Sequence, residues 1–256
     1  MALLKVSGLA KSFGGVKAVS DLSFAVAPNQ IKAIIGPNGA GKTTVFNLLC
    51  GVFAADAGTV EFAGRNISSL APYVRARLGV GRTFQNTLLF DEMSVEENVM
   101  AATEAGLRLN AFAYLFRWPA VARAERQRRE IAAEALKLVG LQDKARDPAG
   151  NLPAGERRLL EIARALGTRP EIVLLDEPAA GLNNAETDRL KHAIRAIRDR
   201  SITVLLVEHD MGLVMEICDE IVVLDQGAKI AEGPPLLIQE DDRVIEAYLG
   251  RPADNA

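Results

Sequence analysis

The sequence predicts an α/β fold in which a parallel sheet carries helices on its faces. Short runs rich in β-branched residues alternate with longer segments of helical periodicity. Near-continuous apolar runs are typical of strands buried on both faces of a parallel sheet, and strand–helix alternation produces such a sheet. We predict strands at Ile31–Ile35, Ile172–Asp176, Thr203–Val207 and Ile221–Leu224, and helices at Lys42–Cys50, Glu156–Leu166, Ala185–Arg200 and Met211–Ile217.

Two regions depart from this alternation. Short strand candidates bounded by Gly, Ser, Pro and Asn lie at Ala2–Val6, Leu22–Val26 and Thr59–Phe62, and they predict a small antiparallel sheet beside the main one. Residues 91–150 are mostly helical in pattern. The mixed-sign charge run at 123–130 is typical of a helix face in contact with water.

The composition is that of a soluble globular protein. The chain has 256 residues, of which 49% are hydrophobic and 25% charged, and a formal net charge of -3. These values exclude a disordered or collagen-like chain and argue against a strongly basic surface for nucleic acid. The N-terminus shows no secretion signal, and the apolar runs fall short of the ~20 residues of a spanning helix. We expect a soluble chain linked to any membrane through a partner, with Cys50 and Cys218 buried and unpaired.

The segment after the first predicted parallel strand matches the phosphate-binding pattern G-x-x-x-x-G-K-[ST]. Its three glycines permit backbone conformations that aim successive N–H groups at one anion, and the helix that follows adds its positive dipole end. Lys42 can reach the β- and γ-phosphates, and the Thr43 hydroxyl can bind Mg²⁺. We therefore predict a site for a nucleoside triphosphate and its Mg²⁺, formed by Gly36, Pro37, Asn38, Gly39, Ala40, Gly41, Lys42, Thr43 and Thr44.

A second strand delivers two carboxylates to the same edge of the sheet. Four apolar residues, Ile172–Leu175, precede Asp176, Glu177 and Pro178. Ligands of open α/β sheets bind at the carboxyl ends of the strands. We expect Asp176 to hold Mg²⁺ through water, and Glu177, one residue further out, to polarise the attacking water.

Four further segments follow in order: Arg82-Thr-Phe-Gln-Asn86, Asn151-Leu-Pro-Ala-Gly-Glu-Arg-Arg158, Ala179-Ala-Gly-Leu-Asn183 and Val207-Glu-His-Asp210. With the phosphate loop and the carboxylate pair, they make the chain similar to the ATP-binding subunits of ABC transporters along essentially its full length. The resemblance implies ATP and Mg²⁺ as ligands, with Gln85 in contact with Mg²⁺ and the attacking water. It also implies that His209 is the switch histidine and that Phe13, where tyrosine is commoner, stacks on adenine.

The resemblance also implies how the chain is divided. Residues 1–256 form one ATP-binding domain, in which 1–85 and 160–256 make a phosphate-loop (RecA-like) core with the small N-terminal antiparallel β subdomain. Residues 86–159 make an inserted α-helical subdomain, which includes the signature motif of the family.

The signature motif departs from the family's usual Leu-Ser-Gly-Gly-Gln. Proline replaces the serine and has neither a hydroxyl nor an N–H, so two possible hydrogen-bond donors to a γ-phosphate are lost. Proline is compatible with the first turn of a helix, and the Gly155 N–H and the helix dipole remain. We expect the architecture to be kept, while the departure puts full hydrolytic competence in question. The motif corresponds to Leu152, Pro153, Ala154, Gly155 and Glu156.

Within the family, the chain is most similar to the ATPases of branched-chain amino-acid importers, through residues 82–90, 101–130 and 244–250. The likeness implies two ATPase subunits stacked head-to-tail, with each ATP between the phosphate loop of one and the signature of the other. It implies permease subunits, indirectly a solute-binding protein, no nucleic acid, and a location at the cytoplasmic face of the inner membrane. The permease is expected to meet the groove near Gln85, and candidates for that contact, or for plain helical core, are Leu88, Leu89, Phe90 and Met93.

Two alternatives stay open on the sequence alone. One is an ATP-binding regulatory subunit with weak hydrolysis, which the altered signature favours and which Glu177 and His209 oppose. The other is an ATPase of a transporter for another solute. A DNA-repair ATPase of this family would need a long coiled-coil insert, for which the interval between Thr44 and Asn151 is too short. A translation factor of this family would carry two ATPase modules, and the sequence contains one.

Overall fold

A six-stranded sheet forms the centre of the computed structural model, which describes residues 1–83, 89–103 and 119–249. Five strands run parallel, and β10 pairs antiparallel with β9 at one edge. The four predicted parallel strands are confirmed, and β6 and β10 extend the sheet beyond the prediction. In sheet order, the strands are β10 (Ala228–Gly233), β9 (Glu220–Asp225), β3 (Ile31–Ile35), β8 (Thr203–Val207), β7 (Ile172–Asp176) and β6 (Val80–Arg82).

The predicted small antiparallel sheet is also confirmed, with longer strands than the sequence pattern indicates. β1 begins at Leu4, and its pairing with β2 continues to the Phe13–Val16 pair at the Gly14–Gly15 turn. The strand order is β2 (Val16–Val26), β1 (Leu4–Phe13), β4 (Ala57–Phe62) and β5 (Arg65–Asn66).

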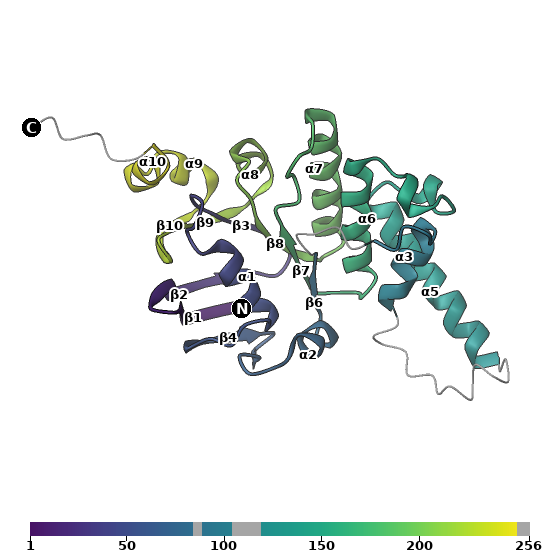
Figure 1. Ribbon diagram of the computed structural model, residues 1–256, viewed down its shortest axis with the longest axis horizontal. Coiled ribbons are helices and arrows are strands. Elements are labelled where there is room, and N and C mark those ends of the chain that lie inside the picture. Colours follow the sequence, from purple (N-terminus) through teal and green to yellow (C-terminus); the bar gives the residue numbers. More distant parts are fainter. Residues whose placement is uncertain (84–88, 104–118, 250–256) are drawn as a thin grey trace, which may run out of the picture.

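Layers cover both faces of the central sheet (Figure 1). One face packs against α1 (Lys42–Cys50) and the antiparallel sheet, and the other against α6 (Ala154–Leu166), α7 (Asn184–Asp199) and α8 (Met211–Ile217). These helices confirm the predicted ones to within two residues at each end. The other helices are α2 (Pro72–Arg77), α3 (Val95–Ala102), α5 (Pro119–Leu138), α9 (Pro235–Gln239) and α10 (Asp242–Leu249), with short 3₁₀ turns at Gln142–Lys144 and Ala149–Asn151.

The alternation of side chains along each parallel strand explains why these strands are apolar throughout. In β8, Val204 and Leu206 pack on the side of the covering helices, whereas Leu205 and Val207 pack on the side of α1 and the antiparallel sheet. Successive residues of a strand point to opposite faces. Because both faces are covered, every position of the strand is buried.

Lys32 interrupts this apolar pattern in β3 and is 1% exposed. Its Nζ donates to the Ala25 carbonyl oxygen at 2.7 Å and to the carboxylates of Glu220 at 2.9 Å and Glu232 at 2.5 Å. A buried ammonium group is tolerated when it is paired and hydrogen-bonded. The Lys32 amine therefore joins β3 to β2, β9 and β10 at one point.

The helical region carries its charges on the surface, as predicted. In α5, Arg126 pairs with Glu130 and Arg129 pairs with Glu125, and all four side chains are exposed.

Within the described ranges, the helices lack the combination of length and apolarity that crossing a membrane requires. Both cysteines are buried and unpaired, which confirms their predicted role as small core side chains.

Phe46 tests the packing of α1 against the two sheets. It is fully buried in the cluster that joins them. We expect Phe46→Ala to lower the free energy of unfolding by about 3–5 kcal/mol, because the lost contacts and the remaining cavity both destabilise the core. Chemical denaturation measures the change. Tyr73→Ala is the control: Tyr73 is 65% exposed, and a change near or below ~0.5 kcal/mol is expected. Equal losses in the two variants would contradict the packing described.

Candidate functional site

The phosphate loop runs from β3 to α1, and two of its glycines lie where no side chain fits. Gly36 has φ 150° and Gly41 has φ 97°. A Cβ on Gly36 would lie 2.1 Å from the Leu224 carbonyl oxygen, and a Cβ on Gly41 would lie 2.3 Å from that of Ala18. Because the opposing atoms belong to backbone, they cannot turn aside, and only glycine permits this loop conformation.

Lys42, the first residue of α1, folds back over the loop. Its Nζ donates to the carbonyl oxygens of Gly36 at 2.7 Å and Pro37 at 3.0 Å. Burial lowers the pKa of the Lys42 amine, and the negative charge of Glu177 opposes that shift. A phosphate oxygen in the loop offers this amine a charged acceptor in place of two neutral ones, and charge-assisted hydrogen bonds are the stronger kind.

A cavity of about 580 Å³ opens over the phosphate loop. It brings Glu177, which follows β7, to the loop that follows β3, as the carboxyl-edge argument predicts. Phe13 is absent from its lining: the Phe13 ring is 42% exposed and lies edge-on to Phe53, with the ring centroids 5.2 Å apart. The residues that line this cavity are Val16, Lys17, Ala18, Asn38, Gly39, Ala40, Gly41, Lys42, Thr43, Thr44, Glu177 and Gln226.

Asp176 ends β7 with a buried side chain beside Arg82. Its Oδ2 accepts a bond from Arg82 Nη2 at 3.2 Å, and its N–H donates to Thr83 Oγ1 at 3.2 Å. Burial raises the pKa of the Asp176 carboxyl, and the charge of Arg82 opposes that shift. Arg82 also donates to Asn47 Oδ1 of α1 at 2.8 Å. Arg82 thus connects Asp176 to α1, the helix after the phosphate loop. In the sequence, the only indication of this contact is that Arg82 lies close to Gln85.

The oxygens near the loop fit a Mg²⁺ site. Asp176 Oδ1 is buried and has no hydrogen-bond partner among the described residues, and a buried carboxylate oxygen without a donor fits a cation or its bound water. The hydroxyl-bearing Thr43 is exposed at the loop. The described ranges contain no group of three or more His, Cys, Asp or Glu side chains that could hold a metal. Mg²⁺ keeps several waters and binds through one or two carboxylates plus substrate phosphates, so Asp176 and Thr43 fit it as protein ligands.

Glu177 has a backbone conformation that is unusual for its residue type. Its φ is 47°, which is uncommon for a residue with a side chain and costs on the order of 1 kcal/mol or more. Its N–H donates to the Val207 carbonyl oxygen of β8 at 2.9 Å. This bond holds the turn after β7 to the end of the neighbouring strand, and the half-buried Glu177 side chain lines the phosphate-loop cavity.

His209 and Glu208 follow β8. The His209 side chain is 58% exposed and does not line the phosphate-loop cavity, and its Nδ1 lies 3.9 Å from Glu208 Oε2. Glu208 is fully buried, and its carboxylate accepts bonds from the N–H groups of Ala179, His209 and Asp210. The sequence patterns predict no role for Glu208. The signal that could have found it is a charged residue directly after a fully apolar strand.

The signature segment lies apart from the phosphate loop within the chain. Pro153 is the N-cap of α6, which begins at Ala154, so the helix tolerates the proline as predicted. Glu156 is paired with Lys144, whose Nζ lies 2.7 and 2.5 Å from the two carboxylate oxygens. A separate cavity of about 280 Å³ is lined by Pro153, Gly155, Glu156, Leu159, Asn183, Ala185, Glu186 and Arg189. Of the other predicted residues, Leu152 is buried and Ala154 is exposed.

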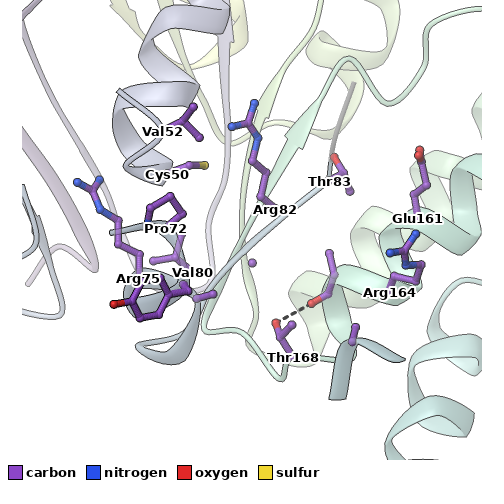
Figure 2. A pocket seen from close by; sticks show the side chains of 15 residues that line it. Cys50, Val52, Pro72, Arg75, Val80, Arg82, Thr83, Glu161, Arg164 and Thr168 are labelled. Carbon is purple, nitrogen blue, oxygen red and sulfur yellow. Dashed lines mark hydrogen bonds between the residues drawn. The ribbon is translucent and has the colours of Figure 1, made fainter. Parts of the chain in front are cut away.

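A further cavity, which we call the β6–α6 groove, has a volume of about 320 Å³. Figure 2 shows Cys50, Pro72 and Arg75 on one side, and Glu161 and Arg164 of α6 on the other. Its remaining lining residues are Val52, Tyr73, Ala76, Val80, Gly81, Arg82, Thr83, Ala102, Ala165 and Thr168.

Some of the residues expected to contact a permease lie within the described ranges. Gln85 and Leu88 lie outside the described residues. Leu89 packs partly buried against the main core, and Met93 is half-buried. Phe90 is 50% exposed, with its ring centroid 5.3 Å from the Arg164 guanidinium carbon. Of the described candidates, Phe90 is therefore the one with substantial free surface.

Two family models and several curated proteins match this chain. A family model described as "ABC transporter" matches residues 19–180, and one described as "Branched-chain amino acid ATP-binding cassette transporter" matches residues 228–254. The high-affinity branched-chain amino acid transport ATP-binding protein BraF of Pseudomonas aeruginosa is 49% identical over 249 residues, which are 97% of this chain and 98% of that protein. The protein LivG of Escherichia coli, which has the same description, is 45% identical with the same coverage.

More distant relatives share the fold over the whole chain. The lipopolysaccharide export system ATP-binding protein LptB of Escherichia coli is 36% identical over 98% of both chains. A crystal structure of the ADP conformation of MJ1267, an ATP-binding cassette of an ABC transporter, has a TM-score of 0.85 at 31% identity. It covers 98% of this chain and 100% of that one.

Two glycines of the loop give a matched test of its conformation. Gly41→Ala would place a Cβ against the Ala18 carbonyl oxygen, whereas Gly39, with φ 83°, has no heavy atom within 4 Å of its Cβ position. Both variants lose the ease of glycine at positive φ, at about 1–2 kcal/mol. We expect Gly41→Ala to destabilise the protein by at least ~2 kcal/mol more than Gly39→Ala, measured by thermal and denaturant unfolding. Equal destabilisation would contradict the close backbone approach.

Proposed function

The chain belongs to the ABC transporter family, and we propose that it is the ATP-hydrolysing subunit of an importer for branched-chain or related amino acids. The solute class is supported by the higher identity to BraF and LivG, at 49% and 45%, than to LptB, at 36%. It is further supported by the match of residues 228–254 to the branched-chain amino acid family model. The observation that carries the role in hydrolysis is that Glu177 and the phosphate loop line one cavity.

Binding of the triphosphate rests on the loop and Lys42. The loop N–H groups and the start of α1 hold the phosphates, and the Lys42 amine exchanges its two carbonyl acceptors for phosphate oxygens. Thr43, Asp176 and Gln85 hold Mg²⁺, which supplies neutralisation of phosphate charge when bound. Phe13, exposed at the end of β1, offers its ring to adenine.

Hydrolysis rests on Glu177. Its carboxylate accepts a hydrogen bond from the attacking water and orients that water toward the γ-phosphate. The bond from the Glu177 N–H to the Val207 carbonyl oxygen fixes the backbone that carries this carboxylate. His209, exposed after β8, contacts the γ-phosphate from the neighbouring loop.

A second ATPase subunit completes the site. In one chain, the signature segment and the phosphate loop line different cavities. We infer a head-to-tail pair in which ATP lies between the loop of one subunit and the signature of the other. The Gly155 N–H and the α6 dipole then approach the γ-phosphate, and Lys144 offsets the charge of Glu156. ATP stabilises the closed pair, and hydrolysis removes the bridging charge and opens it.

The β6–α6 groove is the proposed contact with a membrane permease. It lies between β6, α2 and α6, so a segment seated in it would touch both the sheet and the helix that begins with the signature. Its walls include the apolar residues Val52 and Val80, with the exposed Tyr73 at its edge. The permease holds this subunit at the cytoplasmic face of the membrane and relays the arrival of a solute-binding protein.

Glu177→Gln tests the role in hydrolysis. In vesicles containing the wild-type subunit, the permease and the binding protein, ATP turnover is expected to rise when leucine, isoleucine or valine is added. Glu177→Gln is expected to lower kcat at least 100-fold, because the water loses its carboxylate partner. ATP affinity, measured by calorimetry, is expected to stay within about twofold, and an ATP-loaded complex accumulates.

Three outcomes would overturn or redirect this proposal. Near wild-type turnover in Glu177→Gln would refute its role as the base. Stimulation by a different solute class alone would point to a transporter for that solute. Turnover that appears only when a second, different ATPase subunit is present would favour the regulatory alternative, for which the proline at position 153 is the supporting observation.

Tyr73→Glu tests the groove. Tyr73 is 65% exposed, so the variant is expected to keep the wild-type melting temperature. A carboxylate at this edge is expected to lower the amount of permease that co-purifies with the subunit by about tenfold or more, because docking would remove its charge from water. The matched control is Ile245→Glu, an exposed apolar residue of α10 outside the groove. Wild-type co-purification of Tyr73→Glu would place the permease elsewhere.

A further inference from the structure

Glu208 is a buried carboxylate that the proposed mechanism does not use. It follows the last residue of β8 and precedes His209, and it is 0% exposed. Apart from the His209 ring, no side-chain cation of the described residues lies within ion-pair distance of it. A buried charge without such a partner requires several hydrogen bonds. Glu208 therefore depends on the backbone groups around it.

Those backbone groups come from two different loops. Oε1 accepts the N–H of Ala179 at 2.7 Å, and Oε2 accepts the N–H groups of His209 at 3.0 Å and Asp210 at 3.4 Å. Ala179 lies two residues after Glu177, in the loop that follows β7. One side chain thus spans from the Glu177 loop to the His209 loop.

A backbone bond at Glu177 also ties its loop to the last residue of β8. The Glu177 N–H donates to the Val207 carbonyl oxygen at 2.9 Å. Two bonds therefore hold the positive-φ turn. The N–H of Glu177 is bound by β8, and the N–H of Ala179, two residues later, is bound by the Glu208 carboxylate. Strained conformations persist only where the surroundings determine them.

We propose that Glu208 is a positioning residue that holds the Glu177 loop and the His209 loop in one fixed arrangement for hydrolysis. This inference rests on the proposed function, because it assigns Glu208 an effect on the reaction that Glu177 carries out. A carboxylate suits the position because both of its oxygens accept hydrogen bonds. Glutamine has the same shape but only one acceptor oxygen, so its NH₂ group would face the N–H of one loop or of the other.

The test compares Glu208→Gln with the wild-type subunit in the assembled transporter. We expect kcat for ATP to fall about tenfold or more, because one loop loses its acceptor in a place that water does not reach. We expect KM for ATP, and the ATP affinity of the isolated subunit, to stay within twofold, because the phosphate loop is untouched. An unchanged kcat would overturn the proposal. A parallel loss of kcat and ATP affinity would also overturn it, since it would show general disruption.

Glu232→Gln is the matched control. It removes a partly buried carboxylate of β10 that pairs with Lys32 and Lys229 and lies outside the phosphate-loop cavity, and its kcat is expected to stay within twofold. If Glu208→Gln does not fold, amide hydrogen exchange of the wild-type subunit decides. The Ala179 amide is expected to be protected at least 100-fold, and exchange at the rate of an open loop would overturn the proposal.

Failure of this inference is distinguishable from failure of the proposed function. If Glu177→Gln abolishes turnover while Glu208→Gln leaves kcat unchanged, Glu177 keeps its role and Glu208 has none. If Glu177→Gln leaves turnover unchanged, the proposed base is wrong, and the positioning role of Glu208 is overturned with it.

Discussion

The site depends on the close approach of backbone to backbone around the phosphate loop. The loop passes within van der Waals contact of two backbone carbonyl oxygens, one in β9 and one in β2, at the two glycines that exclude a Cβ. A hydrogen bond from the Gly227 N–H to the Ala40 carbonyl oxygen, at 3.1 Å, adds a third point of contact. The shape of the phosphate loop therefore depends on its contacts with both sheets. These contacts require glycine at the two positions where a Cβ would collide with backbone.

The parallel sheet positions the other site residues relative to the phosphate loop. β3, β7 and β8 end at the same edge, and the register pairs Asp176 of β7 with Val207 of β8. Groups that lie far apart in sequence therefore meet beyond the strand ends, which is where open α/β sheets bind ligands. The site needs short connections after each strand, and the strain at Glu177 is located in one of them.

The parts of the fold that follow from local pattern could be predicted from the sequence. The parallel strands are apolar runs, and the helices between them have helical periodicity. The loop pattern predicted the place of Lys42, and the shared carboxyl edge of the strands predicted that Glu177 lies near it. β6 is three residues long, and β10 is an edge strand in which three of the six residues are exposed, so neither has a pattern of its own. The contacts of Arg82 and Glu208 are tertiary: each connects residues more than 25 positions apart, and no local spacing encodes them.

The buried amine of Lys32 has a mechanical consequence. It bonds to strands of both sheets, and separating a buried cation from its partners costs several kcal/mol. The Lys32 amine therefore resists separation of the antiparallel sheet from the central sheet. α3 and α5 pack on each other and on α6, and α6 in turn packs on the central sheet. We therefore expect the two sheets to move together, and any displacement of α3 and α5 to reach them through α6.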